Sequence, residues 1–488
     1  MDTIDRGIAD VGDLAEPSPS RVRRRRRFGI GGEMVVTAIL GVALSFVTAM
    51  AIIDGVPTKA VAIPAAAIVG LALVWVALND LETFVLAALA IRSSLDAING
   101  GPQVVLGLLL LCAGAFWLFN RQMQLRRDFP MSRLGVAYVV FLIAALMGIF
   151  TSANLVSSAV EWSRIASIVV VYLVVEQFAA RGSAIKPFVG VIGLAMVVPA
   201  AVALAQLLSG EGLFIAGGYS RITGSFAHSN PLAYFSVIVL LVMVAVHPVV
   251  TGLTRAATSV VIITSTVLLV LTYTRSAWIV ALLGVVVLLW RRRSLPAIAV
   301  ILAGVLLAGA TPQIQGRFAD LDTSAQASGK PANSLAWRYA YWQESLELAK
   351  PSPIAGVGLR SVAATTQEGK QPHNDVVRSY VELGIPGLVT YLFVLGMMLW
   401  TGIAAAADAR RRRLRGIDRA LAEASLVVAL TMVTLSFVAN LMSQVVVTLY
   451  AVTVLALASG ASLRRRRLDA EAQAMATEVA RLAPVART

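Results

Sequence analysis

Long apolar runs recur along almost the whole chain, and they constrain its fold more than any other feature. A helix needs about 20 apolar residues to cross the hydrocarbon of a bilayer. Of the 488 residues, 58% are hydrophobic and only 14% are charged. The mean hydropathy of +0.79 is foreign to a water-soluble domain of this size. The sequence therefore predicts an all-α polytopic membrane protein.

Fourteen runs are candidate spans, of which the third and the tenth are weak. Twelve is the alternative count if two of them are re-entrant or interfacial. The sequence thus predicts a bundle of about 12–14 transmembrane helices. The candidate spans are residues 34–53, 60–79, 83–98, 103–119, 134–150, 163–180, 186–208, 231–250, 256–273, 277–290, 295–310, 386–404, 421–440 and 444–461.

Arginine clusters predict the orientation of the chain. The formal charge of +14 comes from 41 Lys and Arg against 27 Asp and Glu. The clusters fall at 21–27, 121–133, 291–293, 410–419 and 464–467, in short segments between spans or at a terminus. Fourteen spans place all of them on the cytoplasmic side, as the positive-inside rule requires. We therefore expect both termini in the cytoplasm of a cell inner or plasma membrane, with membrane lipids and not nucleic acid as the partners of these arginines.

Five regions follow from this threading. No disulfide or metal cluster is indicated, because the single cysteine, Cys112, lies inside a candidate span. The regions are a disordered basic N-terminus (1–33), N-terminal spans (34–208), a catalytic region (209–404) with exterior loops 209–230 and 311–385, a C-terminal hairpin with a basic loop (405–461) and a cytoplasmic tail (462–488).

Two exterior segments carry isolated arginines. The glycine-rich loop 209–230 contains Arg221 and His228, and its exposed backbone amides suit an anion. A guanidinium is a forked, permanently charged donor for phosphate. Arg275 lies in a very short hairpin between apolar runs, where an unpaired charge is costly, so we expect an anionic partner there. By contrast, Glu161 and Arg164 are interpreted as ordinary anchors at an outer boundary.

The largest exterior segment is predicted to cap a cavity. Asn333 or Ser334 begins a helix that stops at Pro351, and its aromatic residues predict that it lies at the membrane surface. This helix contributes Arg338. The run that follows contains Gly356, Gly358 and Arg360 and is interpreted as a second exposed, cationic backbone turn.

Residues 371–387 place a histidine at the mouth of a span. Asp375, favoured over Asn374 as the cap, is expected to begin a short helix over 376–383. Gly384 and Pro386 should end it before the next apolar run. His373 would then lie directly before this helix, facing outward.

A cationic, glycine-lined exterior site suits a substrate that carries a diphosphate. Arginines neutralise a leaving diphosphate without a metal, and an imidazole takes a proton from a hydroxyl near neutral pH. A diphosphate attached to an oily group suggests a polyprenyl-linked sugar.

The order of these motifs resembles the O-antigen ligases and the wider ligase and polymerase superfamily. His373 and Asn374 are followed after nine residues by Gly384 and then by Gly387. The run from Arg221 to Gly224 precedes His228, Asn230 and Pro231. The resemblance covers roughly residues 200–400 and includes the hairpin around Arg275 and the turn around Gly356 and Gly358.

The resemblance implies a GT-C-like bundle and a metal-independent, inverting glycosyltransferase that needs no cofactor. Such an enzyme moves a glycan from a polyprenyl diphosphate, such as undecaprenyl diphosphate, to a lipid, glycan or protein acceptor at the exterior face. His373 is implied as the base or as a phosphate contact. Arg221 and Arg275 are implied as diphosphate ligands, with Arg338 and Arg360 as further candidates. The supporting residues are Gly224, His228, Asn230, Gly356, Gly358, Asn374, Gly384 and Gly387.

Three alternatives stay open. The usual signature continues with Thr and Gln after the second glycine, but Leu388 and Val389 follow here, so a polymerase that uses lipid-linked repeats as donor and acceptor is the nearest rival. A lipid-glycan flippase would need cationic residues along a path through the membrane. A metal-dependent transferase would need an acidic pair, for which the sequence offers Asp54 in the first exterior loop, or Asp320 with Asp322.

Overall fold

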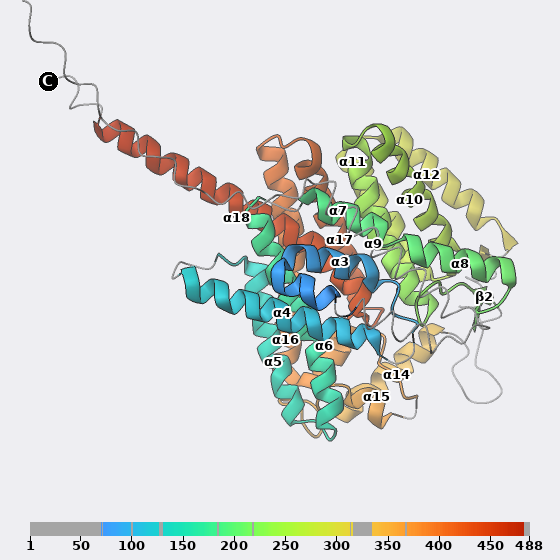
Figure 1. Ribbon diagram of the computed structural model, residues 1–488. Helices are drawn as coiled ribbons and strands as arrows, with labels where there is room; N and C mark the ends of the chain where they lie inside the picture. The colour runs from blue at the N-terminus through green and yellow to red at the C-terminus, as the bar shows by residue number, and fades with distance from the viewer. Residues whose placement is uncertain are drawn as a thin grey trace, which may run out of the picture.

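The computed structural model describes residues 70, 72–98, 101–125, 130–182, 185–216, 219–312, 314–315, 334–366 and 368–482. In this part of the chain nearly all regular structure is helical, apart from one short hairpin (Figure 1). The predicted span 34–53 and the acidic residues Asp54, Asp320 and Asp322 lie outside the described residues.

The helices follow one another with short connections. Two three-residue strands, β1 (Phe214–Ala216) and β2 (Tyr219–Arg221), pair antiparallel with Phe214 opposite Arg221. The helices are α3 (Leu81–Arg92), α4 (Pro102–Leu125), α5 (Arg133–Phe150), α6 (Leu155–Ala180), α7 (Ile185–Leu194), α8 (Val197–Ser209), α9 (Ser229–Val246), the 3-10 turn η1 (His247–Val249), α10 (Gly252–Leu271), α11 (Arg275–Arg291), α12 (Leu295–Gly309), α14 (Ser334–Ala349), α15 (Ser361–Thr365), α16 (Asp375–Arg411), α17 (Gly416–Ser436) and α18 (Val445–Leu482).

Among the described residues, nine helical segments are long and apolar enough to cross a membrane. They confirm the prediction of an all-α polytopic membrane protein. The third predicted span, 83–98, is wrong as drawn, because α3 ends at Arg92 after 12 residues. At 1.5 Å per residue such a helix is only about 18 Å long. The chain then turns, and the Ser93 hydroxyl donates to the carbonyl of Ala195 at 2.7 Å.

Small residues let the central helices pack closely. A Cβ on Gly460 of α18 would lie 2.2 Å from the carbonyl oxygen of Glu176 in α6. A Cβ on Gly402 of α16 would lie 2.7 Å from the Cα of Leu426 in α17. Such close backbone approach is how membrane helices gain packing energy where the surrounding lipid is as apolar as they are. The pairs α6–α18 and α16–α17 therefore form the centre of the bundle.

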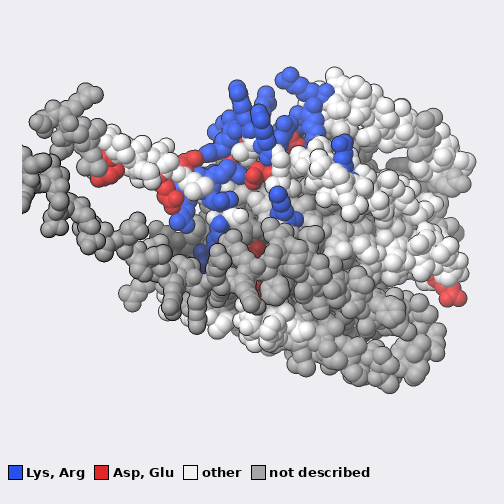
Figure 2. Space-filling view, turned by 45° about the horizontal axis from the view of Figure 1, so that its top comes forward, with Lys and Arg blue, Asp and Glu red and all other residues white. Residues whose placement is uncertain are grey.

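Lys and Arg side chains gather over one end of the bundle, which we call the basic end (Figure 2). It comprises the turns at residues 291–293 and 410–413 and the run 464–467 of α18. Ion pairs join these segments, since Arg412 contacts Asp469 at 2.6 Å and Arg292 contacts Glu423 at 2.7 Å. Three of the predicted arginine clusters therefore share one end. Beyond it, α18 continues as an exposed helix that projects from the bundle (Figure 1).

Candidate functional site

The opposite end, which we call the site end, is built from strands β1 and β2, the α10–α11 turn, α14, α15 and the start of α16 (Figure 1). Each of these segments carries or adjoins a residue that the sequence singled out. Among the described residues, three of the five non-glycine residues with positive φ also lie here, namely Tyr273, Arg360 and His373. Left-handed backbone at such residues is uncommon and concentrates at functional sites.

Arg221 connects the β1–β2 loop to the α10–α11 turn. Its side chain is buried. Its Nε donates to the carbonyl of Thr272 at 2.6 Å, and its Nη2 donates to Asn230 Oδ1 at 2.9 Å and to Thr274 Oγ1 at 2.7 Å. Much of the guanidinium fork is therefore used to hold the protein together, which the prediction of a pure phosphate ligand did not include.

The loop after Arg221 is held by a residue that the sequence analysis missed. Gln206 Oε1 accepts from the amides of Thr223 and Gly224 at 3.1 and 2.9 Å. Gly224 has a φ of +56°, and a Cβ there would lie 2.9 Å from the carbonyl oxygen of Pro199. A lone glutamine near the end of an apolar helix gives no local signal of this role.

His228 caps α9 and faces the same loop. Its Nδ1 accepts from the amide of Asn230 at 3.2 Å, and its ring packs on Phe214 with centroids 4.2 Å apart. Because Nδ1 is an acceptor, the proton of the neutral ring is on Nε2. Burial, together with the charges of Arg221 and Lys370, lowers the pKa of His228 to about 4.

His373 lies at a left-handed position, with φ of 52°, directly before α16. The Trp337 ring meets it edge-on, with centroids 5.9 Å apart. Burial is the largest cause that lowers the pKa of His373 to about 4, and the nearby Arg338, His228 and Lys370 contribute to the same lowering. Both histidines and these cations therefore share one electrostatic environment, and both rings are neutral near pH 7.

Arg338 belongs to the helix α14. Its Nη1 donates to the carbonyl of Val438 in the α17–α18 turn at 3.0 Å. The helix itself is confirmed, and Tyr341 is buried in a small cluster with Val362 and Val381. One aromatic face of α14 thus covers α15 and α16, a packing that the prediction of a membrane-surface helix did not include.

The start of α16 corrects one prediction and confirms another. The cap is Asn374, whose Oδ1 accepts from the amides of Val376 and Val377 at 3.0 and 3.1 Å, and not Asp375. The predicted break at Gly384 is confirmed, because the backbone there is not helical, at φ 65° and ψ −161°. A second helical stretch follows directly and continues to Arg411, because Pro386 falls in its first turn, where the missing N–H costs little.

The glycines of this region serve close packing. A Cβ on Gly384 would lie 2.0 Å from the carbonyl oxygen of Ile354, and one on Gly356 would lie 2.5 Å from that of Glu382. The amide of Gly358 donates to the backbone carbonyl of Glu382 at 2.9 Å. The expectation that Gly356 and Gly358 expose their amides to an anion is therefore wrong, since the backbone of the kinked helix occupies that space. Gly387 packs as tightly, with an added Cβ 2.7 Å from the carbonyl oxygen of Ser379.

A fully buried arginine that the sequence did not reveal anchors α16. Arg378 donates to Glu161 at 2.8 Å and to Glu382 at 2.9 Å. Glu161 also accepts from Arg164 at 2.9 Å. Glu161 is thus not a surface anchor, as interpreted from the sequence, but the buried partner of an arginine 217 residues away. No spacing rule on one helix could have predicted that pair.

The structure also shows where two further predicted arginines, Arg275 and Arg360, lie. Arg275 begins α11 directly after Thr274, which binds Arg221. Tyr234 bonds the neighbouring Ser276 at 3.0 Å and lies within electrostatic range of Arg221 and Arg338. The Arg360 side chain is exposed, and the described contacts do not bring it to His373.

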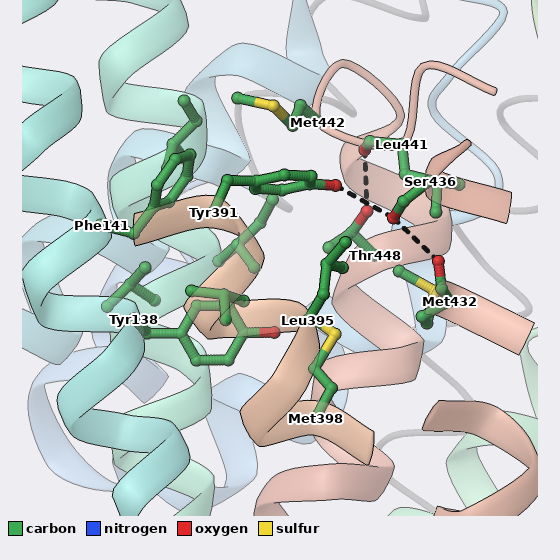
Figure 3. Close-up of a pocket in the computed structure, with 14 residues that line it drawn as sticks. Tyr138, Phe141, Tyr391, Leu395, Met398, Met432, Ser436, Leu441, Met442 and Thr448 are labelled. Carbon is green, nitrogen blue, oxygen red and sulfur yellow. Dashed lines mark hydrogen bonds between the residues drawn. The ribbon is translucent and has the colours of Figure 1, made fainter. Parts of the chain in front are cut away.

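A small apolar pocket lies between α5, α6, α16, α17 and α18, and residues 391–398 of α16 face it (Figure 3). Aromatic and methionine side chains line it, while the hydroxyl of Tyr391 points to Ser436 at 3.0 Å. The same hydroxyl contacts Asp375 Oδ2 at 3.3 Å. The pocket is therefore connected to the first turn after His373.

These features define a polytopic helical membrane protein that gathers two imidazoles and several guanidinium groups at one end of its bundle. Residues 260–392 match the O-antigen ligase family. This stretch, which contains Arg275, Arg338, Arg360 and His373, belongs to the O-antigen ligase superfamily, and the resemblance seen in the motifs is confirmed there. Arg221 and His228 precede the matched residues. No curated protein matches the chain.

Proposed function

We propose that the protein is a membrane glycosyltransferase that moves a glycan from a polyprenyl diphosphate donor to an acceptor hydroxyl. The observation that carries the proposal is the shared environment of His373, His228, Arg338 and Lys370 inside a region related to O-antigen ligases. The family supports an O-antigen ligase or polymerase type of membrane function. The donor, the mechanism and the roles of individual residues are our proposal.

In this mechanism the acceptor oxygen attacks the anomeric carbon of the donor sugar. The new carbon–oxygen bond forms as the bond to the diphosphate breaks, with inversion, and His373 takes the acceptor proton. Arg338 and Lys370, with Arg221 and Arg275 behind them, neutralise the charge of the leaving diphosphate. Since arginines supply that charge, no metal ion is required. Arg360, the remaining candidate ligand of the diphosphate, has an exposed side chain.

The low pKa of His373 in the free protein is compatible with its role as a base if donor binding raises that pKa. A base with a pKa near 4 accepts protons poorly at pH 7. The nearby cations contribute to that low value, and a bound diphosphate would neutralise them. The donor would therefore raise the pKa of His373 toward neutrality and make it a better base only once it is bound.

We also propose that the basic end faces the cytoplasm and the site end faces outward. The gathering of the arginine turns at one end supports this orientation, because cytoplasmic loops carry the excess of Lys and Arg (Figure 2). Glycan transfer would then occur at the exterior face of the membrane.

The first test replaces His373 by Ala in the full chain and measures glycan transfer in detergent with a polyprenyl diphosphate glycan. We expect a loss of at least about 100-fold, the usual contribution of a positioned base. His247→Ala is the matched control, because that ring contacts Ser259 near the other end of α9. Activity that survives His373→Ala, or that requires an added divalent ion, would contradict the proposal.

The same assay separates a ligase from a polymerase. A ligase transfers the glycan to a distinct lipid, glycan or protein acceptor and gives one product per donor. A polymerase lengthens the donor itself when no other acceptor is present. Products of increasing length from the donor alone would favour the polymerase.

A further inference from the structure

A second, smaller pocket lies between α3, α4 and α6, beside the first residue of α18. It is partly enclosed, and its lining shares only Arg164 with the residues described for the candidate site. Two arginines, Arg92 and Arg164, line it together with Gln103 and two serines. Guanidinium groups meeting in one enclosed space are unusual in a membrane bundle, because each charge is costly to bury.

Arg92 reaches this pocket with a guanidinium whose only close partner among the described residues is long. Its side chain is only 5% exposed, and its Nη1 makes an ion pair with Asp96 at 3.5 Å, at the limit of a hydrogen bond. Among the described residues Nη1 has no shorter hydrogen bond. Buried polar atoms of this kind normally have a ligand or an ordered water.

The charges around the pocket favour an anion. Arg164 shares the Glu161 carboxylate with the buried Arg378, and the long ion pair with Asp96 is the carboxylate contact of Arg92. The positive charges of Arg92 and Arg164 act on each other. The pocket also lies at the first turn of α4, a 24-residue helix whose N-terminal end carries a partial positive charge.

The surroundings indicate that the anion arrives on a lipid. Leu108, which lines the pocket, is 44% exposed, and its neighbour Val105 is 58% exposed. In a membrane protein such an apolar helix face contacts hydrocarbon. A lipid whose charged headgroup lies between Arg92 and Arg164 could therefore place its hydrocarbon chain along α4.

We propose that this pocket binds a phosphate group carried by a membrane lipid. The phosphate oxygens would accept from Arg92 Nη1 and from Arg164, and the hydrocarbon would lie against the outer face of α4. The lipid is either an ordinary anionic phospholipid or a polyprenyl phosphate, since both present the same oxygens. This site is separate from the proposed transfer reaction and does not depend on it.

The test is native mass spectrometry of the purified full-length chain in detergent. The added ligands are phosphatidylglycerol, a polyprenyl monophosphate, inorganic phosphate and, as a phosphate-free lipid, diacylglycerol. We expect one of the two phosphate-bearing lipids to be retained and diacylglycerol to be lost. Which lipid is retained identifies the source, whereas retention of inorganic phosphate alone would show that no lipid chain is recognised and would overturn the proposal.

Variants locate the binding. Arg92→Gln should weaken retention of the lipid by about tenfold or more, the usual effect of losing a charge-assisted hydrogen bond. Arg255→Gln, which removes an exposed arginine from α10, is the charge-matched control. Equal retention by Arg92→Gln and the wild type would overturn the proposal.

A second variant fills the pocket without touching a charge. A Cβ on Gly107, which lines the pocket, meets no atom within 4 Å, so Gly107→Leu should fold and should also reduce lipid retention. Gly304→Leu in α12, where a Cβ also meets open space, is its control. This pair keeps the test decisive if Arg92→Gln does not fold.

Discussion

At the scale of single residues, the neutral state of His373 has a measurable consequence. A base must be unprotonated, so activity is lost as the pH falls through its pKa. The profile of kcat/KM reports the free enzyme, and we expect its acid limb near pH 4, the pKa that burial gives His373. The profile of kcat reports the donor complex, and its limb should lie at higher pH. Acid limbs at the same pH in both profiles would contradict the proposal that the donor tunes this ring.

Arg221 makes a second prediction at this scale. Because its guanidinium holds Thr272, Asn230 and Thr274, Arg221→Ala leaves buried acceptors without a donor. We expect a loss of stability on the order of 2–3 kcal/mol together with loss of transfer. Thermal unfolding in detergent measures the first effect, and Arg255→Ala, at an exposed position, is the control. A variant that is inactive but as stable as the wild type would instead assign Arg221 a direct role toward the substrate.

Single residues also show where sequence reasoning stops. His373, Arg221 and His228 could be found because isolated polar residues beside apolar runs are conspicuous. Gln206 and Arg378 could not, because their partners are far away in sequence or are backbone atoms of another segment. Gly356 and Gly358 were recognised as special positions but for the wrong reason, since glycine marks close backbone packing and exposed amides equally well.

At the scale of elements, the kink of α16 positions the histidine. Gly384 has a backbone conformation that only glycine adopts readily, and the carbonyl of Ile354 fills the space of a side chain. The kink thus fixes the short segment 375–383 against the 353–358 turn while the rest of α16 runs through the bundle.

We therefore expect Gly384→Ala to lower stability by about 3 kcal/mol or more and to abolish transfer. Gly396→Ala, in the same helix, is the matched control, because a Cβ there meets no atom within 4 Å and helix propensity improves. Thermal unfolding of both purified variants makes the comparison. Equal midpoints would show that the kink is not a constraint.

The sequence predicted the helices themselves better than it predicted which parts of the protein they pack against. The helix after Asn333 and the break at Gly384 follow from caps and from glycine, which are local signals. The packing of α14 on α15 and α16 does not follow from local signals, because a stripe of aromatic residues packs equally well on lipid and on protein. The length of α3 was misjudged, since the predicted span ran on through residues 93–98, although Ser93, Ser94 and Asp96 already interrupt the apolar run there.

At the scale of the whole molecule, the orientation can be tested directly. Cys112 is the only cysteine, so its replacement by Ser gives a background for single-cysteine variants. Lys350, 70% exposed at the site end, and Arg411, 78% exposed at the basic end, provide the two positions. We expect a membrane-impermeant maleimide to label Lys350→Cys in intact cells and Arg411→Cys only after the membrane is opened. The reverse pattern would invert the proposed topology.

The buried contact between α6 and α16 has a consequence for biosynthesis. Glu161 leaves the ribosome 217 residues before Arg378, its partner in the finished bundle. A nascent chain that has inserted α6 therefore holds Glu161 beside Arg164 of the same helix but without the arginine from α16. A chain truncated before α16 should be degraded quickly in pulse-chase experiments, and Glu161→Gln should extend its lifetime. If the truncated chain and its Glu161→Gln variant decay at the same rate, the unpaired Glu161 does not destabilise the inserted intermediate.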